Sequence, residues 1–285
     1  MRLSVFFDHV REAAAQTGKP LREVLSLCRA EGVEGLEIRD LHLREREAEL
    51  SPMLKEVGLQ ISCVYGMHDL GCPGEEGLAT ARETLRLAGR HGCRRVLLVP
   101  GALEAAEADA LNALSPEDTA AFMARNPAVC RMRDRLRLLV AEAEQLRVTV
   151  TLEDYDGARE PYARRAQLRW FMEQVPGLRF TLDTGNFAFS DEDVLAAQTL
   201  LAPWVAHVHC KDRGEEPGMT GRQHCRGLAP VAVGDGYLPV DEVVRRLKAG
   251  GYQGFLAIEH FGARDQLGAI RRSARYLSGL LIEGA

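Results

Sequence analysis

The sequence predicts an α/β fold, a single (β/α)8 barrel that covers residues 1–285. Eight short, β-rich runs alternate along the whole chain with longer segments of helical periodicity, and this rhythm is typical of parallel βαβ units. A chain of 285 residues is long for one ordinary domain but has the size of one closed barrel. No internal repeat, low-complexity tract or linker interrupts the sequence, so we expect one domain.

The eight predicted strands are short runs of apolar, β-branched and aromatic residues, the composition that favours a pleated, buried strand. In chain order they are Leu3–Phe7, Gly35–Arg39, Leu59–Val64, Arg95–Val99, Val148–Glu153, Leu178–Asp183, Val205–His209 and Phe255–Glu259.

The segments between these runs are predicted to be helices. In Leu21–Ala30 apolar side chains recur at helical spacing, and Ala79–Ala88 and Val243–Leu247 behave likewise. A glycine follows several of the helices where the chain turns into the next strand, and glycine readily adopts the left-handed conformation that ends a helix. These glycines are Gly32, Gly92 and Gly251.

Two longer connections interrupt the alternation. One runs from Gly101 to about Arg131 and contains Ser115-Pro-Glu-Asp118, a helix-start signal, and Asn126-Pro127, an expected interruption. The other, Asp212–Leu238, follows the seventh strand and is rich in glycine and arginine. Long loops at the carboxyl end of barrel strands usually carry function.

Four of the predicted strands end in an acid or an imidazole: Glu153, Asp183, His209 and Glu259. Because side chains alternate between the two faces of a strand, each of these residues lies opposite the strand's apolar face. In parallel strands of a barrel, the four side chains would converge at the carboxyl ends. Three carboxylates and one imidazole suit Mn²⁺, Mg²⁺ or Co²⁺, and Zn²⁺ is compatible. The alternative is a network of ion pairs with lysine or arginine.

Composition and charge exclude several classes of protein. The hydrophobic content of 46% and charged content of 27% are those of a globular protein. A net charge of −5 gives no general attraction to nucleic acid or to anionic membranes. The apolar stretch before Asp8 is too short for a signal peptide, and no run approaches the roughly 18 apolar residues of a membrane helix. Seven scattered cysteines without a Cys-x-x-Cys pair indicate a reducing, cytoplasmic compartment.

Three motifs in the second half of the chain carry a resemblance. They are Leu182-Asp-Thr-Gly-Asn186, His207-Val-His-Cys-Lys-Asp212, and Gly234-Asp-Gly-Tyr237 followed by Gly251-Tyr-Gln-Gly-Phe-Leu-Ala-Ile-Glu259. Their order and spacing resemble the sugar phosphate isomerase/epimerase group of xylose isomerase-like TIM barrels, which includes ketose 3-epimerases, hydroxypyruvate isomerases and inosose dehydratases. The chain is more distantly similar to endonuclease IV. The resemblance covers nearly the whole chain and is strongest from Val148 onward.

The resemblance implies that Glu153, Asp183, His209 and Glu259 hold one divalent metal ion, and that Glu153 and Glu259 also act as acid and base. Such an ion polarises a substrate carbonyl, acidifies the neighbouring C–H and stabilises the resulting cis-enediolate. Two carboxylates can then remove and return a proton. The expected function is therefore a metal-dependent isomerase or epimerase of a small sugar or sugar-like keto compound. Dimers and tetramers are common in this group, so a homo-oligomer is compatible.

One position departs from the pattern. The resembled 3-epimerases carry a substrate-binding histidine three residues after the metal-binding aspartate, where this chain has Asn186. The sugar preference of those enzymes therefore does not carry over to this chain. Endonuclease IV uses a histidine at the same place to hold a three-zinc cluster, so Asn186 and the acidic net charge both disfavour DNA repair.

Further polar residues are candidates for binding the substrate, each with a structural alternative. Lys211 shares its strand face with His209 and should face the mouth of the barrel, although an ion pair with Asp183 or Glu259 is equally compatible. Glu37 and Arg39 share one face of the second predicted strand and should both point into the barrel. Arg39 would there contact either the substrate or Glu37. The remaining candidates are Asn186, Arg213, His68, which follows the third strand, and His224, in the arginine-rich loop.

Three other functions stay open. A lyase of the inosose dehydratase type would use the same ion but expel a hydroxyl group. A barrel that binds sugar without turnover is disfavoured by the complete set of four ligands. Phosphodiester hydrolysis would need several zinc ions and a basic face. Gly-x-Gly-x-x-Gly, Walker and Gly-x-Ser-x-Gly motifs are absent, so nucleotide-dependent redox chemistry and serine hydrolysis lack support.

Overall fold

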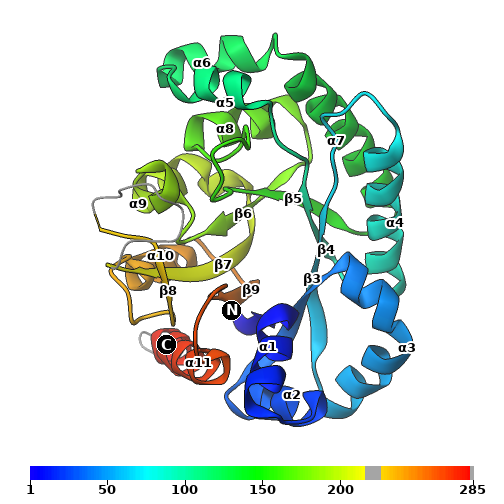
Figure 1. The fold of residues 1–285 in the computed structure, drawn as a ribbon, viewed down its shortest axis with the longest axis vertical. Coiled ribbons are helices and arrows are strands. Elements are labelled where there is room, and N and C mark those ends of the chain that lie inside the picture. Colours follow the sequence, from blue (N-terminus) through cyan, green and yellow to red (C-terminus); the bar gives the residue numbers. More distant parts are fainter. Residues whose placement is uncertain (216–225, 283–285) are drawn as a thin grey trace.

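The computed structural model describes residues 1–215 and 226–282, in which eight parallel strands form a closed ring (Figure 1). Each strand pairs in parallel with the next, and the last pairs with the first, as a (β/α)8 barrel requires. The prediction of this fold is confirmed. In ring order the strands are β1 (Arg2–Phe6), β2 (Val33–Arg39), β3 (Gln60–Met67), β4 (Arg95–Val99), β5 (Thr149–Glu153), β6 (Arg179–Asp183), β7 (Val205–Gly214) and β9 (Phe255–Glu259).

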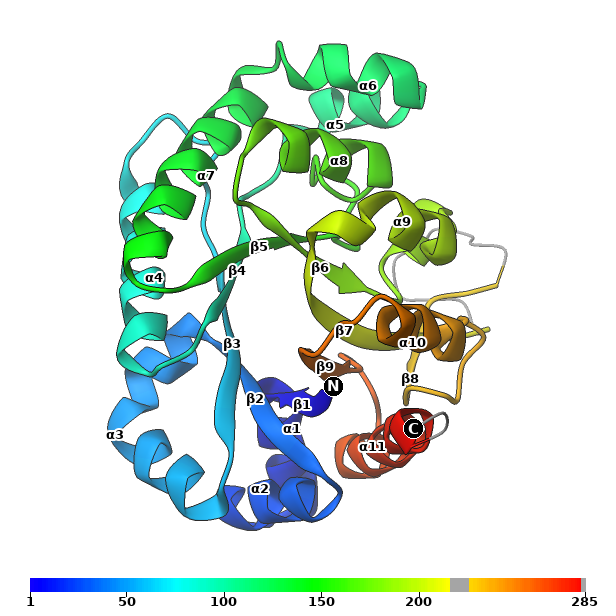
Figure 2. The ribbon, with the colours of Figure 1, turned by 180° about the vertical axis from the view of Figure 1, so that it is seen from behind.

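The described residues form eleven α-helices, which lie outside the ring of strands (Figures 1 and 2). They are α1 (Phe7–Thr17), α2 (Leu21–Ala30), α3 (Asp40–Val57), α4 (Glu76–Arg90), α5 (Ala105–Asn112), α6 (Pro116–Met123), α7 (Pro127–Gln145), α8 (Arg165–Gln174), α9 (Val194–Leu201), α10 (Val240–Ala249) and α11 (Gln266–Ile282). Short 3-10 helices, η1 (Phe187–Ser190) and η2 (Ala202–Trp204), precede α9 and β7. The last helix, α11, packs against α1 and so completes the outer layer.

Alternation along the strands separates two environments. Val150 and Leu152 of β5 belong to the hydrophobic core, together with apolar residues of the surrounding helices. Thr151 and Thr181 are fully buried and form a hydrogen bond between their hydroxyl groups, at 2.8 Å, across β5 and β6. The same parity places Glu153 and Asp183, two residues further along each strand, on the face that carries these threonines.

The predicted helix signals are confirmed by the backbone. Gly32, Gly92 and Gly251 have φ of 87°, 65° and 77°, a left-handed conformation that costs glycine little. The hydroxyl of Ser115 accepts a hydrogen bond from the amide of Asp118 and caps α6. Asn126 caps α7 by accepting from two backbone amides, so the expected interruption is the start of a new helix.

Half of the predicted strand boundaries coincide with those observed, most of the others differ by one or two residues, and two differ by more. β3 continues to Met67, because Tyr65, Gly66 and Met67 pair with β4. β7 continues past His209 to Gly214, because its end pairs antiparallel with an unpredicted strand, β8 (Ala229–Val231). None of the helices described is long and apolar enough to cross a membrane.

Candidate metal centre

The four predicted ligands occupy the carboxyl ends of four strands of the barrel. Glu153 ends β5, Asp183 ends β6 and Glu259 ends β9, while His209 lies in β7 directly opposite Asp183 in the strand register. All four side chains are buried. Their position at this end of the barrel follows from the parallel direction of the strands, because the chain always enters the barrel at the opposite end.

The three carboxylates surround one nitrogen of the imidazole. His209 Nδ1 lies 3.1 Å from Glu153 Oε2, 3.2 Å from Glu259 Oε2 and 3.9 Å from Asp183 Oδ2. Neither this nitrogen nor Asp183 Oδ2 has a hydrogen-bond partner within the described part of the chain. Buried polar atoms without partners are costly, and a cation among them would satisfy both. Carboxylate oxygens and imidazole nitrogen are also the donors that divalent cations prefer, so the residues present fit such an ion.

Backbone amides fix the orientation of Asp183. Its Oδ1 accepts hydrogen bonds from the amides of Gly185 and Asn186, at 2.6 Å and 2.8 Å. Its own amide donates to Asp154 Oδ1 at 2.9 Å. The Leu182-Asp-Thr-Gly-Asn186 motif therefore forms a turn that holds one carboxylate oxygen and leaves the other, Oδ2, directed toward His209.

Crowding and burial change the acidity of the carboxylates. Burial raises the pKa of Asp183 to about 7, against the opposing charge of Lys211. Burial also raises the pKa of Glu153, against the opposing effect of His209. Burial acts in the same direction on Glu259, but Lys211 and His209 outweigh it and hold the pKa of Glu259 well below its usual value. Lys211 and His209 therefore lower the pKa of Glu259, but they do not overcome the effect of burial on the pKa values of Glu153 and Asp183.

Lys211 is buried among the acids. Its ammonium nitrogen lies 2.5 Å from Glu259 Oε1 and 3.4 Å from Asp183 Oδ2, and it donates a hydrogen bond to Asn186 Oδ1 at 2.6 Å. Asp156 Oδ2 is 3.8 Å away. Burial would lower the pKa of Lys211, but Asp156, Asp183 and Glu259 outweigh it and raise the pKa, so the side chain stays charged. In this charged form Lys211 donates hydrogen bonds and neutralises the negative charge of the acids.

Arg213 is held near Lys211 by several acceptors. Its Nη2 lies 2.8 Å from Asp156 Oδ2 and donates to Asn186 Oδ1 at 3.4 Å. Its Nε and Nη1 donate to the carbonyl oxygens of Gly185 and Leu228, each at 3.3 Å. Asp156 and Asn186 thus connect the two cations to the turn after Asp183.

A cavity of about 370 Å³ opens over these residues. Its polar lining includes the predicted residues Arg39, Glu153, Asn186, His209, Lys211, Arg213 and Glu259. Its apolar and aromatic lining includes Phe6, Tyr65, Met67, Tyr155 and Phe261. A cavity of this size and mixed lining is typical of a small-molecule site.

Two predicted residues lie elsewhere. His68 is buried and lines a neighbouring cavity of about 470 Å³, where its two ring nitrogens lie 3.0 Å and 3.2 Å from the hydroxyl groups of Thr80 and Thr84. His224 lies outside the described residues. Arg39 lines both cavities, and its buried Nε has no hydrogen-bond partner among residues 1–215 and 226–282.

Several residues of the site were not predicted from the sequence. Asp154, Tyr155 and Asp156 follow Glu153 directly, and all three contact the site or line the cavity. Their position directly after a predicted strand could have identified them, because polar residues just beyond a barrel strand face the mouth of the barrel.

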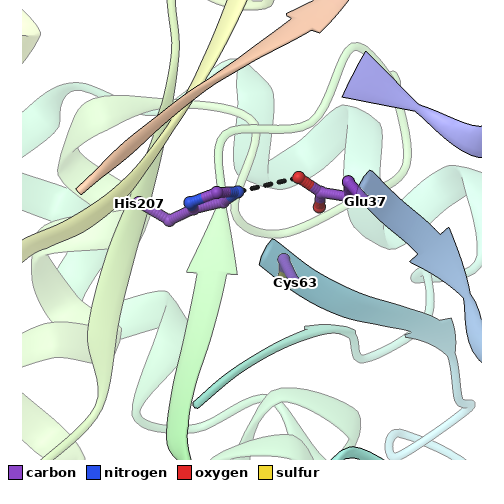
Figure 3. Close-up of side chains that lie close together, drawn as sticks. All are labelled: Glu37, Cys63 and His207. Atoms are coloured by element: carbon purple, nitrogen blue, oxygen red, sulfur yellow. Dashed lines mark hydrogen bonds and ion pairs between the residues drawn. The ribbon is translucent and has the colours of Figure 1, made fainter. Parts of the chain in front are cut away.

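A second cluster lies deeper inside the barrel and includes Glu37, Cys63 and His207 (Figure 3). Glu37 Oε2 lies 2.7 Å from His207 Nε2, and Oε1 lies 3.1 Å from His209 Nε2. Burial would raise the pKa of Glu37, but the two histidines outweigh it and lower the pKa to about 2. Burial raises the pKa of the Cys63 thiol well above its usual value, so this sulfur is protonated in the absence of a metal ion.

Comparison with known proteins decides the family. Residues 25–280 match one family model, that of the xylose isomerase-like TIM barrel. The chain belongs to this family. A search of curated proteins gave no significant match.

Several solved structures are similar in fold over nearly the whole chain. A probable 3-DHS dehydratase from Bacillus anthracis is 17% identical, with a TM-score of 0.72 over 98% of this chain and 99% of that chain. A D-allulose 3-epimerase from Methylomonas sp. is 13% identical, with a TM-score of 0.71 over 98% of each chain. A xylose isomerase-like TIM barrel protein from Mycobacterium smegmatis, in complex with magnesium, is 19% identical, with a TM-score of 0.67 over 91% and 87%. Identities this low support the shared fold alone.

Proposed function

We propose that the protein is a divalent-metal-dependent isomerase or epimerase of a small sugar or sugar-like keto compound. The observation that carries the proposal is the convergence of Glu153, Glu259 and Asp183 Oδ2 on His209 Nδ1, beneath a cavity of substrate size. Glu153, Asp183, His209 and Glu259 would hold one ion, Mn²⁺, Mg²⁺ or Co²⁺ in preference to Zn²⁺. The magnesium complex of a neighbouring structure of the family is compatible with this choice.

When bound, the ion would polarise a substrate carbonyl and acidify the adjacent C–H. The roles of the protein's own residues follow from their positions. Glu153 and Glu259 lie within 3.2 Å of the same imidazole nitrogen, so both carboxylates reach one small volume of the cavity, where one can take a proton and the other return it. Lys211 keeps a positive charge beside Glu259 and offers ammonium hydrogens to substrate oxygens.

The cavity supplies the groups that would position the substrate. Arg39, Asn186 and Arg213 line it together with Lys211, and they provide donors for hydroxyl or carbonyl oxygens. Tyr155 and Phe261 provide aromatic surface that would exclude water from the proton transfer. A cavity of about 370 Å³ is large enough for a small carbohydrate.

A dehydratase is the second candidate function. It is favoured by the likeness to the probable 3-DHS dehydratase, which spans 98% of this chain. A dehydratase would use the same carboxylate to remove a proton beside a carbonyl and a neighbouring acid to protonate the departing hydroxyl. Both functions thus begin with the same step and differ in whether water leaves.

The test is a panel of ketoses, aldoses and hydroxy-keto acids incubated with the metal-loaded protein in D₂O. Isomerase or epimerase activity predicts deuterium at the carbon beside the carbonyl and a product of unchanged mass apart from that label. A dehydratase predicts a product lighter by one water. Metal content is measured by elemental analysis beside Asp183→Ala, and about one ion per chain, lost in the variant, is expected.

Three outcomes would contradict the proposal. Near three zinc ions per chain would favour phosphodiester hydrolysis. Binding of a sugar without exchange or release of water would indicate a binding protein. Absence of any ion after reloading would leave the four strand-end residues as an ion-pair network.

A further inference from the structure

The layer of the barrel directly below the candidate metal centre contains a buried carboxylate with no solvent contact. Glu37 projects inward from β2, and His207 and His209 project from β7, which does not pair with β2. Their exposed fractions are 0%, 0% and 1%. A charge buried this deeply is costly unless it is fully hydrogen-bonded, so its position calls for an explanation.

Both oxygens of this carboxylate are engaged by imidazole groups. Oε2 lies 2.7 Å from His207 Nε2, drawn in Figure 3, and Oε1 lies 3.1 Å from His209 Nε2. An ionised carboxylate can only accept hydrogen bonds, so each Nε2 must carry the hydrogen. His207 and His209 are two residues apart on one strand and therefore share its inward face, one layer above the other.

This arrangement determines which nitrogen of His209 is available. With the hydrogen on Nε2, the lone pair of the neutral ring resides on Nδ1. Nδ1 is the atom that lies 3.1 Å to 3.9 Å from Glu153, Glu259 and Asp183. A carboxylate that binds the far nitrogen of a metal-binding histidine fixes both its tautomer and the orientation of its ring.

We propose that Glu37 is a positioning residue, which holds His209 with its hydrogen on Nε2 so that Nδ1 faces the divalent cation, while His207 anchors the second oxygen of Glu37. This inference rests on the proposed metal site. It gives Glu37 no contact with substrate, and it explains why the buried interior of the barrel contains a carboxylate at this position. Cys63, opposite Glu37 in the β2–β3 register, is a neighbour in this layer and takes no part in either hydrogen bond to the histidines.

The test is Mn²⁺ affinity, measured by calorimetry and by the Mn²⁺ paramagnetic resonance signal on metal-stripped protein. Glu37→Gln preserves size but replaces one acceptor oxygen with an amide NH₂, which opposes Nε2–H of one histidine. We expect Mn²⁺ binding to weaken by about 10- to 100-fold, the range typical of such outer partners. His207→Gln, which keeps a donor toward Glu37, should weaken binding by less. Cys63→Ser is the matched control and should bind Mn²⁺ like the unmodified protein.

Two further measurements separate positioning from a structural role. The melting temperature of the metal-free proteins should differ little between Glu37→Gln and Cys63→Ser, whereas a structural role would lower only the former. The visible spectrum of bound Co²⁺ reports ligand geometry and should change in Glu37→Gln but not in Cys63→Ser. If Glu37→Gln does not fold, His207→Gln tests the same pair.

Several results would overturn the inference. Unchanged Mn²⁺ affinity and an unchanged Co²⁺ spectrum in Glu37→Gln and His207→Gln would show that Glu37 does not orient His209. Two ions per chain in the unmodified protein, with one lost in Cys63→Ser, would make the cluster of Glu37, Cys63 and His207 a metal site itself. Failure of the unmodified protein to bind any divalent ion would instead overturn the metal centre, and the role of Glu37 with it.

Discussion

We propose that the two glutamates beside His209 act as acid and base in the proton transfer, a role that the other two candidate ligands, Asp183 and His209, do not share. We expect Glu153→Gln and Glu259→Gln each to lower solvent-deuterium exchange into the substrate by at least about 100-fold, since positioned acid–base groups typically contribute 10²- to 10⁴-fold. Glu173→Gln removes an exposed carboxylate of α8 that pairs with Arg169; it is the control and should exchange normally. Normal exchange in both site variants would exclude these residues as acid and base.

Arg39 differs from the other two cations that line the cavity. Its buried Nε has no hydrogen-bond partner among the described residues, whereas Lys211 and Arg213 are paired with acids. We therefore expect Arg39→Gln to raise KM by roughly tenfold with little change in kcat, because a hydrogen bond from a charged group contributes about 1.5–3 kcal/mol. Arg44→Gln removes an arginine that pairs with Asp40 and Glu83 and should leave KM unchanged. Steady-state kinetics on the identified substrate would decide, and an equal KM in both variants would contradict a substrate contact.

At the scale of elements, one aspartate fixes the connection that returns from β8 to α10. The carboxylate of Asp212 accepts hydrogen bonds from the backbone amides of Gly234, Gly236 and Leu238, at 3.0 Å to 3.1 Å. A Cβ at Gly236 would collide with this carboxylate, so the glycine permits the close approach. Asp212 thus ties the end of β7 to the segment before α10.

We expect Asp212→Ala to lower the free energy of unfolding by about 3 kcal/mol, because it leaves three partly buried backbone amides without their acceptor. Asp235→Ala lies in the same segment but removes only an exposed ion pair with Arg272, and it should cost less than about 1 kcal/mol. Urea denaturation of the two variants provides the comparison. Equal losses would mean that the loop does not depend on the carboxylate.

The sequence predicted the barrel because its signals are local and repeated. Each β-rich run of a (β/α)8 barrel has its own apolar face, and each helix its own periodicity, so eight independent patterns agree. β8 escaped prediction because Ala229–Val231 has three residues, one of them a proline, and is stabilised by pairing with β7 rather than by its own composition. The end of β7 was not predicted either, because Lys211, Asp212 and Arg213 are charged and lack the composition typical of a strand.

The alternation of side chains along each strand predicted part of the candidate site. Parity placed Glu153, Asp183, His209 and Glu259 on inward faces, and Glu37 as well, but it cannot show which inward residues meet across the ring. The hydrogen bonds between Glu37 of β2 and the two histidines of β7 join residues that are 170 and 172 positions apart in the sequence. Periodicity along a strand gives no information on contacts at such separations. His68 shows that position after a strand is not sufficient to place a residue in the site. It directly follows β3 but lines the neighbouring cavity rather than the cavity over the candidate metal centre.

At the scale of the whole molecule, the barrel gathers three carboxylates and Glu37 into one small, buried volume. Burial of these acids opposes folding, and at Glu153 and Asp183 the positive charges of Lys211 and His209 do not fully offset its effect on the pKa. A divalent cation at His209 Nδ1 would bind the folded chain and not the unfolded one, since the four ligands come from four strands. Metal binding should therefore stabilise the entire barrel rather than the mouth alone.

This coupling predicts the thermal behaviour of the protein. At a free Mn²⁺ concentration of about 100 times Kd, linkage adds about 2.7 kcal/mol of stability, which for a chain of this size raises Tm by roughly 4–6 °C. We propose that residues 1–285 form one domain, so calorimetry should show a single transition that shifts as a unit. Asp183→Ala should abolish the shift, while Asp235→Ala should retain it. Two transitions, of which only one responds to Mn²⁺, would separate the chain into independent units, and an equal shift in Asp183→Ala would place the ion elsewhere.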